Sequence, residues 1–174
     1  MSIRFDINES KIISGIFIIT PSISSDVRGD IWTSFLKNDI EKLLPNNLEF
    51  KHDKFSTSNK NVLRGIHGDN KSWKLITCVY GDIQQVVVDL RINSSTYKHW
   101  QEFRINNKNQ QLILIPPNMG NAFYVCSENA VYHYKLAYDG DYIDADEQFS
   151  LKWDDETIKI KWLTNTPYLS ARDQ

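Results

Sequence analysis

The 174-residue sequence is poor in the features that disulfide-rich, membrane-spanning and polyanion-binding proteins depend on. Its two cysteines, Cys78 and Cys126, each lie within an apolar run, which favours buried thiols over a disulfide framework. No apolar run approaches the roughly 20 residues that a transmembrane helix needs. The first residues also lack the apolar segment of a secretory signal. We therefore expect a cytoplasmic protein without a membrane partner.

Neither sign of charge dominates the sequence. Its 20 Lys and Arg residues nearly balance its 22 Asp and Glu residues, and the basic ones are scattered along the chain. A nucleic-acid partner needs a concentrated positive surface, so we expect none, although a few basic side chains could bind a small anion. The hydrophobic fraction of 41% and the length suit one packed globular domain that spans residues 1–174.

Helical periodicity is confined to residues 32–44, after which Pro45 should stop the helix. Elsewhere, apolar and β-branched runs alternate with turns that carry Gly, Asn, Ser or Pro, including a turn at Gly81-Asp82. Many short antiparallel strands predict an all-β jelly-roll barrel with a few short helices and a pocket between its sheets. The expected strands are 74–80, 83–90, 100–105, 111–115, 122–126 and 131–138.

Four histidines are candidates for proton transfer, and three of them fit other roles. We expect His99 to be exposed and His52 to lie at the surface or at a pocket rim. His133 alternates with the tyrosines on either side of it in a strand, so it should face away from Tyr134. If Tyr134 points into the barrel, His133 points out.

The fourth histidine, His67, has a less ordinary setting. It stands between Gly65 and Gly68, with Arg64 before it and an apolar strand that carries Lys74 after it. Glycine on both sides permits a close approach of other backbone. The residues alone leave a structural and a catalytic role for His67 equally open.

A metal site is not favoured by the histidine spacing. The place of a His-x-His pair is taken by His67-Gly68-Asp69, and the later loop offers Asn121, whose neutral amide is a poor ligand for transition metals. The sequence contains neither a P-loop nor a glycine-rich dinucleotide motif. We therefore expect no metal.

Several motifs follow one another in an order that is specific. They are Asp26-Val-Arg-Gly29, Ser56-Thr-Ser58, Asn61-Val-Leu-Arg-Gly-Ile-His67, Tyr134-Lys135 and Leu169-Ser-Ala-Arg-Asp173. In this combination the chain resembles the dTDP-4-dehydrorhamnose 3,5-epimerases and their cupin relatives. The resemblance implies a cupin barrel, a homodimer and an epimerase that binds a nucleotide-diphosphate 4-keto-6-deoxy sugar. Because the ketone acidifies its neighbouring carbons, neither a metal nor an organic cofactor would be required.

The resemblance also implies roles for individual side chains. His67 matches a general base that Asp173 orients, and Tyr134 matches the acid that returns a proton on the opposite face of the sugar. Lys74 matches a lysine beside the C4 oxygen, where a positive charge would stabilise an enolate. The residues implied in substrate binding are Arg28, Arg64, Asn121, His52, Lys54 and Ser56.

Departures from the family pattern bear on the substrate. Asn121 stands where the family has a pocket histidine. The segments 28–33 and 52–54 also differ from the family sequence, and in the family these segments lie on the nucleotide side of the site. We therefore expect a GDP-linked 4-keto-6-deoxy sugar as the substrate, such as a heptose of a capsule or surface polysaccharide. A dTDP-4-dehydrorhamnose 3,5-epimerase and a non-catalytic nucleotide-sugar-binding protein are the alternatives. Inversion at C3 alone or at C3 and C5 stays open.

Overall fold

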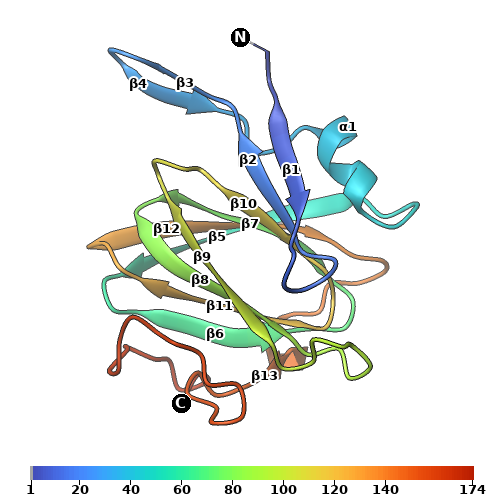
Figure 1. Ribbon diagram of the computed structural model, residues 1–174, viewed down its shortest axis with the longest axis vertical. Helices are drawn as coiled ribbons and strands as arrows, with labels where there is room; N and C mark the ends of the chain where they lie inside the picture. Colours follow the sequence, from blue (N-terminus) through green and yellow to red (C-terminus); the bar gives the residue numbers. More distant parts are fainter. Residues whose placement is uncertain (1) are drawn as a thin grey trace.

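Two antiparallel sheets face each other in the computed structural model, which describes residues 2–174 (Figure 1). In spatial order, the larger sheet contains β1 (Phe5–Glu9), β2 (Phe17–Pro21), β10 (Leu112–Ile115), β7 (Trp73–Tyr80), β12 (Asn129–Ala137) and β5 (Phe50–Asn59). The smaller sheet contains β13 (Phe149–Ser150), β6 (Leu63–Gly68), β11 (Met119–Val125), β8 (Asp82–Asp89) and β9 (Trp100–Asn106). A separate hairpin of β3 (Ile23–Asp26) and β4 (Gly29–Trp32) projects from the barrel.

The turn expected at Gly81-Asp82 is confirmed, and it joins the two sheets. Gly81 alone separates β7 from β8, yet these strands belong to different sheets. Its φ of +95° lies in the region that favours glycine, and a Cβ there would collide with the carbonyl oxygen of Asn129. The tight turn therefore folds one continuous apolar stretch of sequence into both layers of the barrel.

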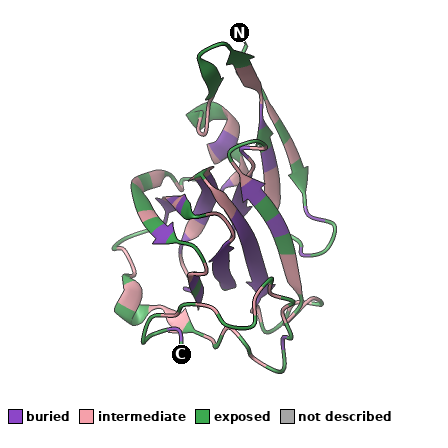
Figure 2. Cartoon of the chain, turned by 90° about the vertical axis from the view of Figure 1, so that its left-hand side faces the viewer, coloured by how far each residue is buried: buried purple, intermediate pink, exposed green. Residues whose placement is uncertain are grey.

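Apolar residues fill one end of the space between the sheets, and polar residues line the other end. Buried residues concentrate on the central strands (Figure 2). The rings of Phe123 and Tyr132 stack with centroids 4.1 Å apart, among the fully buried side chains of Ile76, Val87 and Ile113. Further along the barrel, the inward-facing residues of β7, β11 and β12 are polar. These polar residues line a cavity.

A short helical segment covers the outer face of the larger sheet. It consists of α1 (Lys37–Ile40) and the 3-10 turn η1 (Glu41–Leu43), and it buries Ile40 and Leu44 against Leu75 and Leu112. The helix predicted over residues 32–44 was therefore too long, because Trp32 pairs with Ile23 in the β3–β4 hairpin. Helices within residues 2–174 are all too short to span a membrane.

The predicted strands lie close to the observed ones, with one shift. β11 begins at Met119 instead of Ala122, so the Pro-Pro loop before it is shorter than expected.

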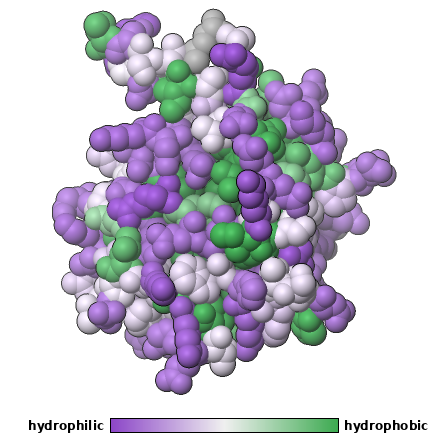
Figure 3. Space-filling model, in the orientation of Figure 1, coloured by the Kyte–Doolittle hydropathy of each residue, from purple (hydrophilic) through white to green (hydrophobic). Residues whose placement is uncertain are grey.

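On the face in Figure 3 most side chains are hydrophilic, and hydrophobic ones appear on the projecting hairpin, where Val27 and Ile31 are exposed.

Gly68 ends β6 where three segments of the chain pack closely together. A single added methyl group at Gly68 should therefore lower the stability of the fold strongly. A Cβ at Gly68 would overlap the carbonyl oxygen of Met119 and the ring of Phe149. We expect Gly68→Ala to lower the free energy of unfolding in urea by about 2–3 kcal/mol. The control is Gly140→Ala, in an exposed loop where the nearest atom, Lys71 Nζ, is 3.6 Å away. Because Gly140 has a φ of +63°, this control should lose about 1 kcal/mol through backbone strain without crowding. An equal loss in both variants would rule out crowding as the cause.

Candidate active site

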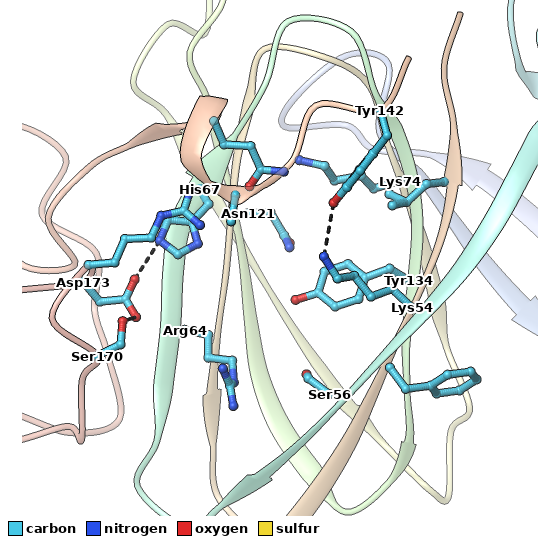
Figure 4. A pocket seen from close by; sticks show the side chains of 15 residues that line it. Lys54, Ser56, Arg64, His67, Lys74, Asn121, Tyr134, Tyr142, Ser170 and Asp173 are labelled. Carbon is cyan, nitrogen blue, oxygen red and sulfur yellow. Dashed lines mark hydrogen bonds and ion pairs between the residues drawn. The ribbon is translucent and has the colours of Figure 1, made fainter. Parts of the chain in front are cut away.

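A cavity of about 330 Å³ lies between the two sheets (Figure 4). The larger sheet contributes side chains from β5, β7 and β12, and the smaller sheet contributes side chains from β6 and β11. The loop after β12 and the C-terminal segment complete the wall. Eight of the predicted site residues line this one cavity: His67, Lys74, Tyr134, Asp173, Lys54, Ser56, Arg64 and Asn121.

His67 and Asp173, which are far apart in sequence, form a close pair. Nε2 of His67 lies 2.6 Å from Oδ1 of Asp173, and Ser170 Oγ donates a hydrogen bond of 2.7 Å to Oδ2 of the same carboxylate. The contact is bent, because neither Nε2 nor Oδ1 meets hydrogen-bond geometry with a partner in the described part of the chain. Since Nε2 faces Asp173, Nδ1 is the ring nitrogen left for a ligand.

The charge of Asp173 is maintained by its surroundings. Burial raises the pKa of this carboxyl group, but the contacts with His67 and Ser170 outweigh burial and hold the pKa below its usual value. A carboxylate beside an imidazole fixes the orientation of the ring.

The C-terminal segment reaches His67 because it runs beside β6. Tyr168 N–H donates to the carbonyl oxygen of Asn61 at 2.8 Å, and Leu63 N–H donates to the carbonyl oxygen of Tyr168 at 3.0 Å. Val62 and Tyr168 also form a parallel bridge. These backbone hydrogen bonds place Asp173 next to the strand that carries His67.

Lys74 supplies a buried positive charge at the cavity. Its Nζ lies 3.2 Å from Oδ2 of Asp69, and both side chains are at least nine-tenths buried. Burial lowers the pKa of Lys74, and the nearby Arg172 lowers it further, while Asp69 opposes both effects. Burial raises the pKa of Asp69, but Lys74 and the backbone N–H groups of Ser72 and Lys71 bring it below its usual value.

Tyr134 faces the cavity from the sheet opposite to His67. Figure 4 shows the Tyr134 hydroxyl and the His67 ring on opposite sides of the cavity. Burial raises the pKa of Tyr134 to about 12, although the positive charge of Arg64 opposes the rise. The phenol is therefore protonated at neutral pH and can donate a proton.

His133 lies on the outer face of β12, as its alternation with Tyr134 predicts. It is nevertheless buried: its Nε2 lies 2.6 Å from Oδ1 of Asp53, and the ring of Phe55 stacks on it with centroids 4.6 Å apart. His99 is exposed, as expected.

Two predicted substrate-binding residues are not brought to the cavity lining. His52 Nδ1 lies 2.9 Å from the hydroxyl of Tyr138, and its ring packs edge-on against Tyr142, which itself lines the cavity. Arg28 is exposed in the β3–β4 hairpin and pairs with Asp26. Neither residue lines the cavity within this chain, because His52 lies behind a lining residue and the hairpin projects away from the barrel. Their roles in substrate binding stay predictions. The homodimer stays a prediction.

Sequence reasoning missed other lining residues. Tyr142 accepts a hydrogen bond of 3.3 Å from Lys54 Nζ, and Gln148, Ser170 and Arg172 also line the cavity. Ser170 and Arg172 belong to the Leu-Ser-Ala-Arg-Asp motif, which could have indicated them. Tyr142 and Gln148 lie in a loop where the sequence contains no periodic signal that shows which side chains turn inward.

Comparison with known proteins identifies the family of this chain. The family model for dTDP-4-dehydrorhamnose 3,5-epimerase matches residues 10–174. The chain belongs to this epimerase family. The dTDP-4-dehydrorhamnose 3,5-epimerase of Salmonella typhimurium is 33% identical over 165 residues, which cover 92% of this chain and 88% of that protein. The dTDP-4-dehydrorhamnose 3-epimerase of Streptomyces niveus is 32% identical over 93% of this chain and 78% of its own length.

Solved structures confirm the fold. A crystal structure of a Legionella pneumophila dTDP-6-deoxy-D-glucose-3,5-epimerase in complex with dTDP-4-keto-L-rhamnose has a TM-score of 0.88 and 32% identity. The match covers 98% of this chain and 90% of that one. The predicted all-β cupin barrel is therefore confirmed, and so is the enzyme class, an isomerase that epimerises a nucleotide-linked 4-keto-6-deoxy sugar.

The Lys74–Asp69 pair predicts a pH-dependent loss of stability in this epimerase. We expect Asp69→Asn to lower the free energy of unfolding at pH 7 by about 3 kcal/mol, because a buried cation is left without its counter-charge. The amide oxygen can still accept the hydrogen bonds from the Lys71 and Ser72 N–H groups. Without Asp69 the folded-state pKa of Lys74 falls further below the usual lysine value, so the unfolded chain binds more protons and stability rises with pH.

Urea unfolding at pH 7 and at pH 9.5 measures this effect. The deficit of Asp69→Asn relative to the unsubstituted protein should shrink at the higher pH. Asp154→Asn, at an exposed carboxylate, is the control and should change the free energy of unfolding by less than about 0.5 kcal/mol. A deficit of Asp69→Asn that is the same at both pH values would contradict the charge explanation.

Proposed function

We propose that this chain epimerises a dTDP-linked 4-keto-6-deoxyhexose at C3 and C5. The observation that carries the proposal is the arrangement of two proton-transfer groups on opposite walls of one cavity. His67, oriented by a carboxylate, faces Tyr134, whose hydroxyl remains protonated at neutral pH. Inversion of a carbon requires removal of a proton from one face and its return to the other, which this arrangement suits.

The chemistry divides between these groups and the buried cation. Nδ1 of His67 takes the proton from a carbon next to the C4 ketone, and the electrons of that C–H bond form an enolate whose negative charge rests on the ketone oxygen. The Lys74 ammonium stabilises that oxygen, and Asp173 stabilises the imidazolium. Tyr134 then donates its proton to the opposite face of the carbon. Proton exchange with solvent restores both side chains.

The positively charged side chains of the cavity support the proposal that the substrate carries a nucleotide diphosphate. Lys54, Arg64 and Arg172 are the cationic side chains of the wall besides Lys74. Ser58 Oγ accepts a hydrogen bond of 2.9 Å from Arg64 Nε and so holds the guanidinium group in place. Guanidinium groups bind diphosphate oxygens through paired hydrogen bonds, which suits a sugar nucleotide.

The comparisons favour dTDP over GDP as the nucleotide. The named relatives act on dTDP-linked sugars, and the solved relative was crystallised with one. The expectation of a GDP-linked heptose rested on departures at segments 28–33 and 52–54. Of the residues in these segments, Lys54 alone lines the cavity in this structure, so the departures at the other positions carry less weight.

Solvent exchange tests the proposal directly. Incubation of the protein with dTDP-4-keto-6-deoxy-D-glucose in D2O should remove the C3 and C5 proton signals from the NMR spectrum and generate a new epimer. The GDP-linked ketose is the comparison substrate and should react more slowly. Binding without exchange on either compound would instead identify a non-catalytic nucleotide-sugar-binding protein. Exchange at C3 alone would identify a 3-epimerase.

Substitution of the two proton-transfer groups should separate their roles. We expect His67→Asn to lower the rate of both exchange and inversion by about 10³-fold, because the base is lost. Tyr134→Phe should retain exchange on the His67 side while inversion falls by about 10²-fold. The matched control is His99→Asn at an exposed histidine, which should leave both rates unchanged. Retention of exchange by His67→Asn would exclude His67 as the base.

A further inference from the structure

Three buried polar side chains form a hydrogen-bonded chain that ends at the cavity. The Tyr132 hydroxyl donates to Oε1 of Gln85 at 2.7 Å, and Nε2 of Gln85 donates to Oδ1 of Asn121 at 2.7 Å. Tyr132 and Gln85 are fully buried, and neither lines the cavity, whereas Asn121 does. These hydrogen bonds therefore connect the packed half of the barrel to the ligand-binding half.

A backbone carbonyl determines the direction of this chain. Nε2 of Gln85 also donates to the carbonyl oxygen of Val86 at 3.0 Å. Because a carbonyl oxygen can only accept, the nitrogen of the Gln85 amide must lie on that side, and its oxygen must face Tyr132. The second N–H of Gln85 then requires an acceptor on Asn121, which is Oδ1. The NH2 group of Asn121 is the half of the amide that remains for the cavity.

The position of Asn121 places this donor next to the proposed base. Asn121 on β11 is the direct cross-strand partner of His67 on β6, and Figure 4 shows both side chains at the same side of the cavity. A carbon that loses its proton to His67 has the ketone one bond away. A donor beside His67 therefore lies where the ketone oxygen of the substrate acquires negative charge.

We propose that Gln85 and Tyr132 are positioning residues that hold the Asn121 NH2 group as a hydrogen-bond donor to the ketone oxygen of the bound sugar. The inference rests on the proposed function. Asn121 shares the developing negative charge with Lys74, but unlike an ammonium or an imidazole it does not titrate. Removal of a preorganised donor of this kind lowers kcat more than substrate affinity, since the donor acts mainly on the transition state.

Gln85→Glu reverses the polarity of the chain with little change in shape. The carboxylate can still accept from Tyr132, but it presents an acceptor to Asn121, which must then turn its NH2 group away from the cavity. We expect kcat for deuterium exchange to fall by about 10²-fold while the affinity for dTDP changes by less than about threefold. Because the introduced carboxyl group can donate a hydrogen bond once it is protonated, the defect in kcat relative to the unsubstituted protein should lessen as the pH falls. Protonation would also relieve the cost of a buried carboxylate, so a second buried Gln→Glu variant outside this hydrogen-bonded chain is needed to separate the two effects.

Gln84→Glu is the matched control for this substitution. Gln84 is equally buried on the same strand, but its amide bonds to Glu102 and to the carbonyl oxygen of Lys161, away from the cavity. We expect this control to unfold at a lower temperature and to keep its kcat within about twofold, since it adds the same charge outside the chain of donors.

Tyr132→Phe provides a second test if Gln85→Glu does not fold. It removes the hydrogen bond that holds Oε1 of Gln85 in place and should lower kcat by about tenfold without a change in dTDP affinity. Normal kcat in the variants of both residues would overturn the positioning role alone. A parallel loss of kcat and dTDP affinity would also overturn it. An unsubstituted protein that is inactive on both nucleotide sugars would overturn the proposed function and this inference together.

Discussion

The ion pair of Lys74 and Asp69 is the constraint around which the rest of the cavity is arranged. An ammonium group inside a barrel is tolerated only when it is paired, and here its Nζ lies 3.2 Å from a carboxylate that is itself nearly fully buried. That carboxylate also accepts hydrogen bonds from the backbone N–H groups of Lys71 and Ser72. The pair thus fixes the turn between β6 and β7, and with it the position of Lys74 relative to His67.

The barrel combines a packed half and a polar half on the same strands. Along β11 the inward positions change from Asn121 at the cavity to Phe123 in the core, and along β12 they change from Tyr134 to Tyr132. The packed residues therefore support the polar ones directly. Gln85 shows the benefit of this arrangement, because a fully buried amide with satisfied hydrogen bonds can orient a neighbour that contacts a ligand.

Much of the site could be predicted from local pattern and from the family resemblance. Strand alternation predicted that His133 would face away from Tyr134, and the family resemblance implied the pairing of His67 with Asp173. The hydrogen-bonded chain from Tyr132 to Asn121 could not be predicted. Which of the two adjacent glutamines, Gln84 or Gln85, faces inward depends on the register of β8 against β11. Positions that depend on how separate segments pack, such as the projecting hairpin and the loop before β13, likewise have no local signal in the sequence.

The central claim is that this cavity polarises a ketone. The most direct test is the 13C NMR resonance of the C4 carbon in labelled dTDP-4-keto-6-deoxy-D-glucose, bound to the His67→Asn variant so that the sugar is not consumed. We predict a carbonyl resonance downfield of that of the free ketone, and a smaller displacement when Lys74→Met is added, because the carbonyl is polarised by donors on its oxygen. A bound ketone whose resonance equals that of the free sugar would contradict this claim.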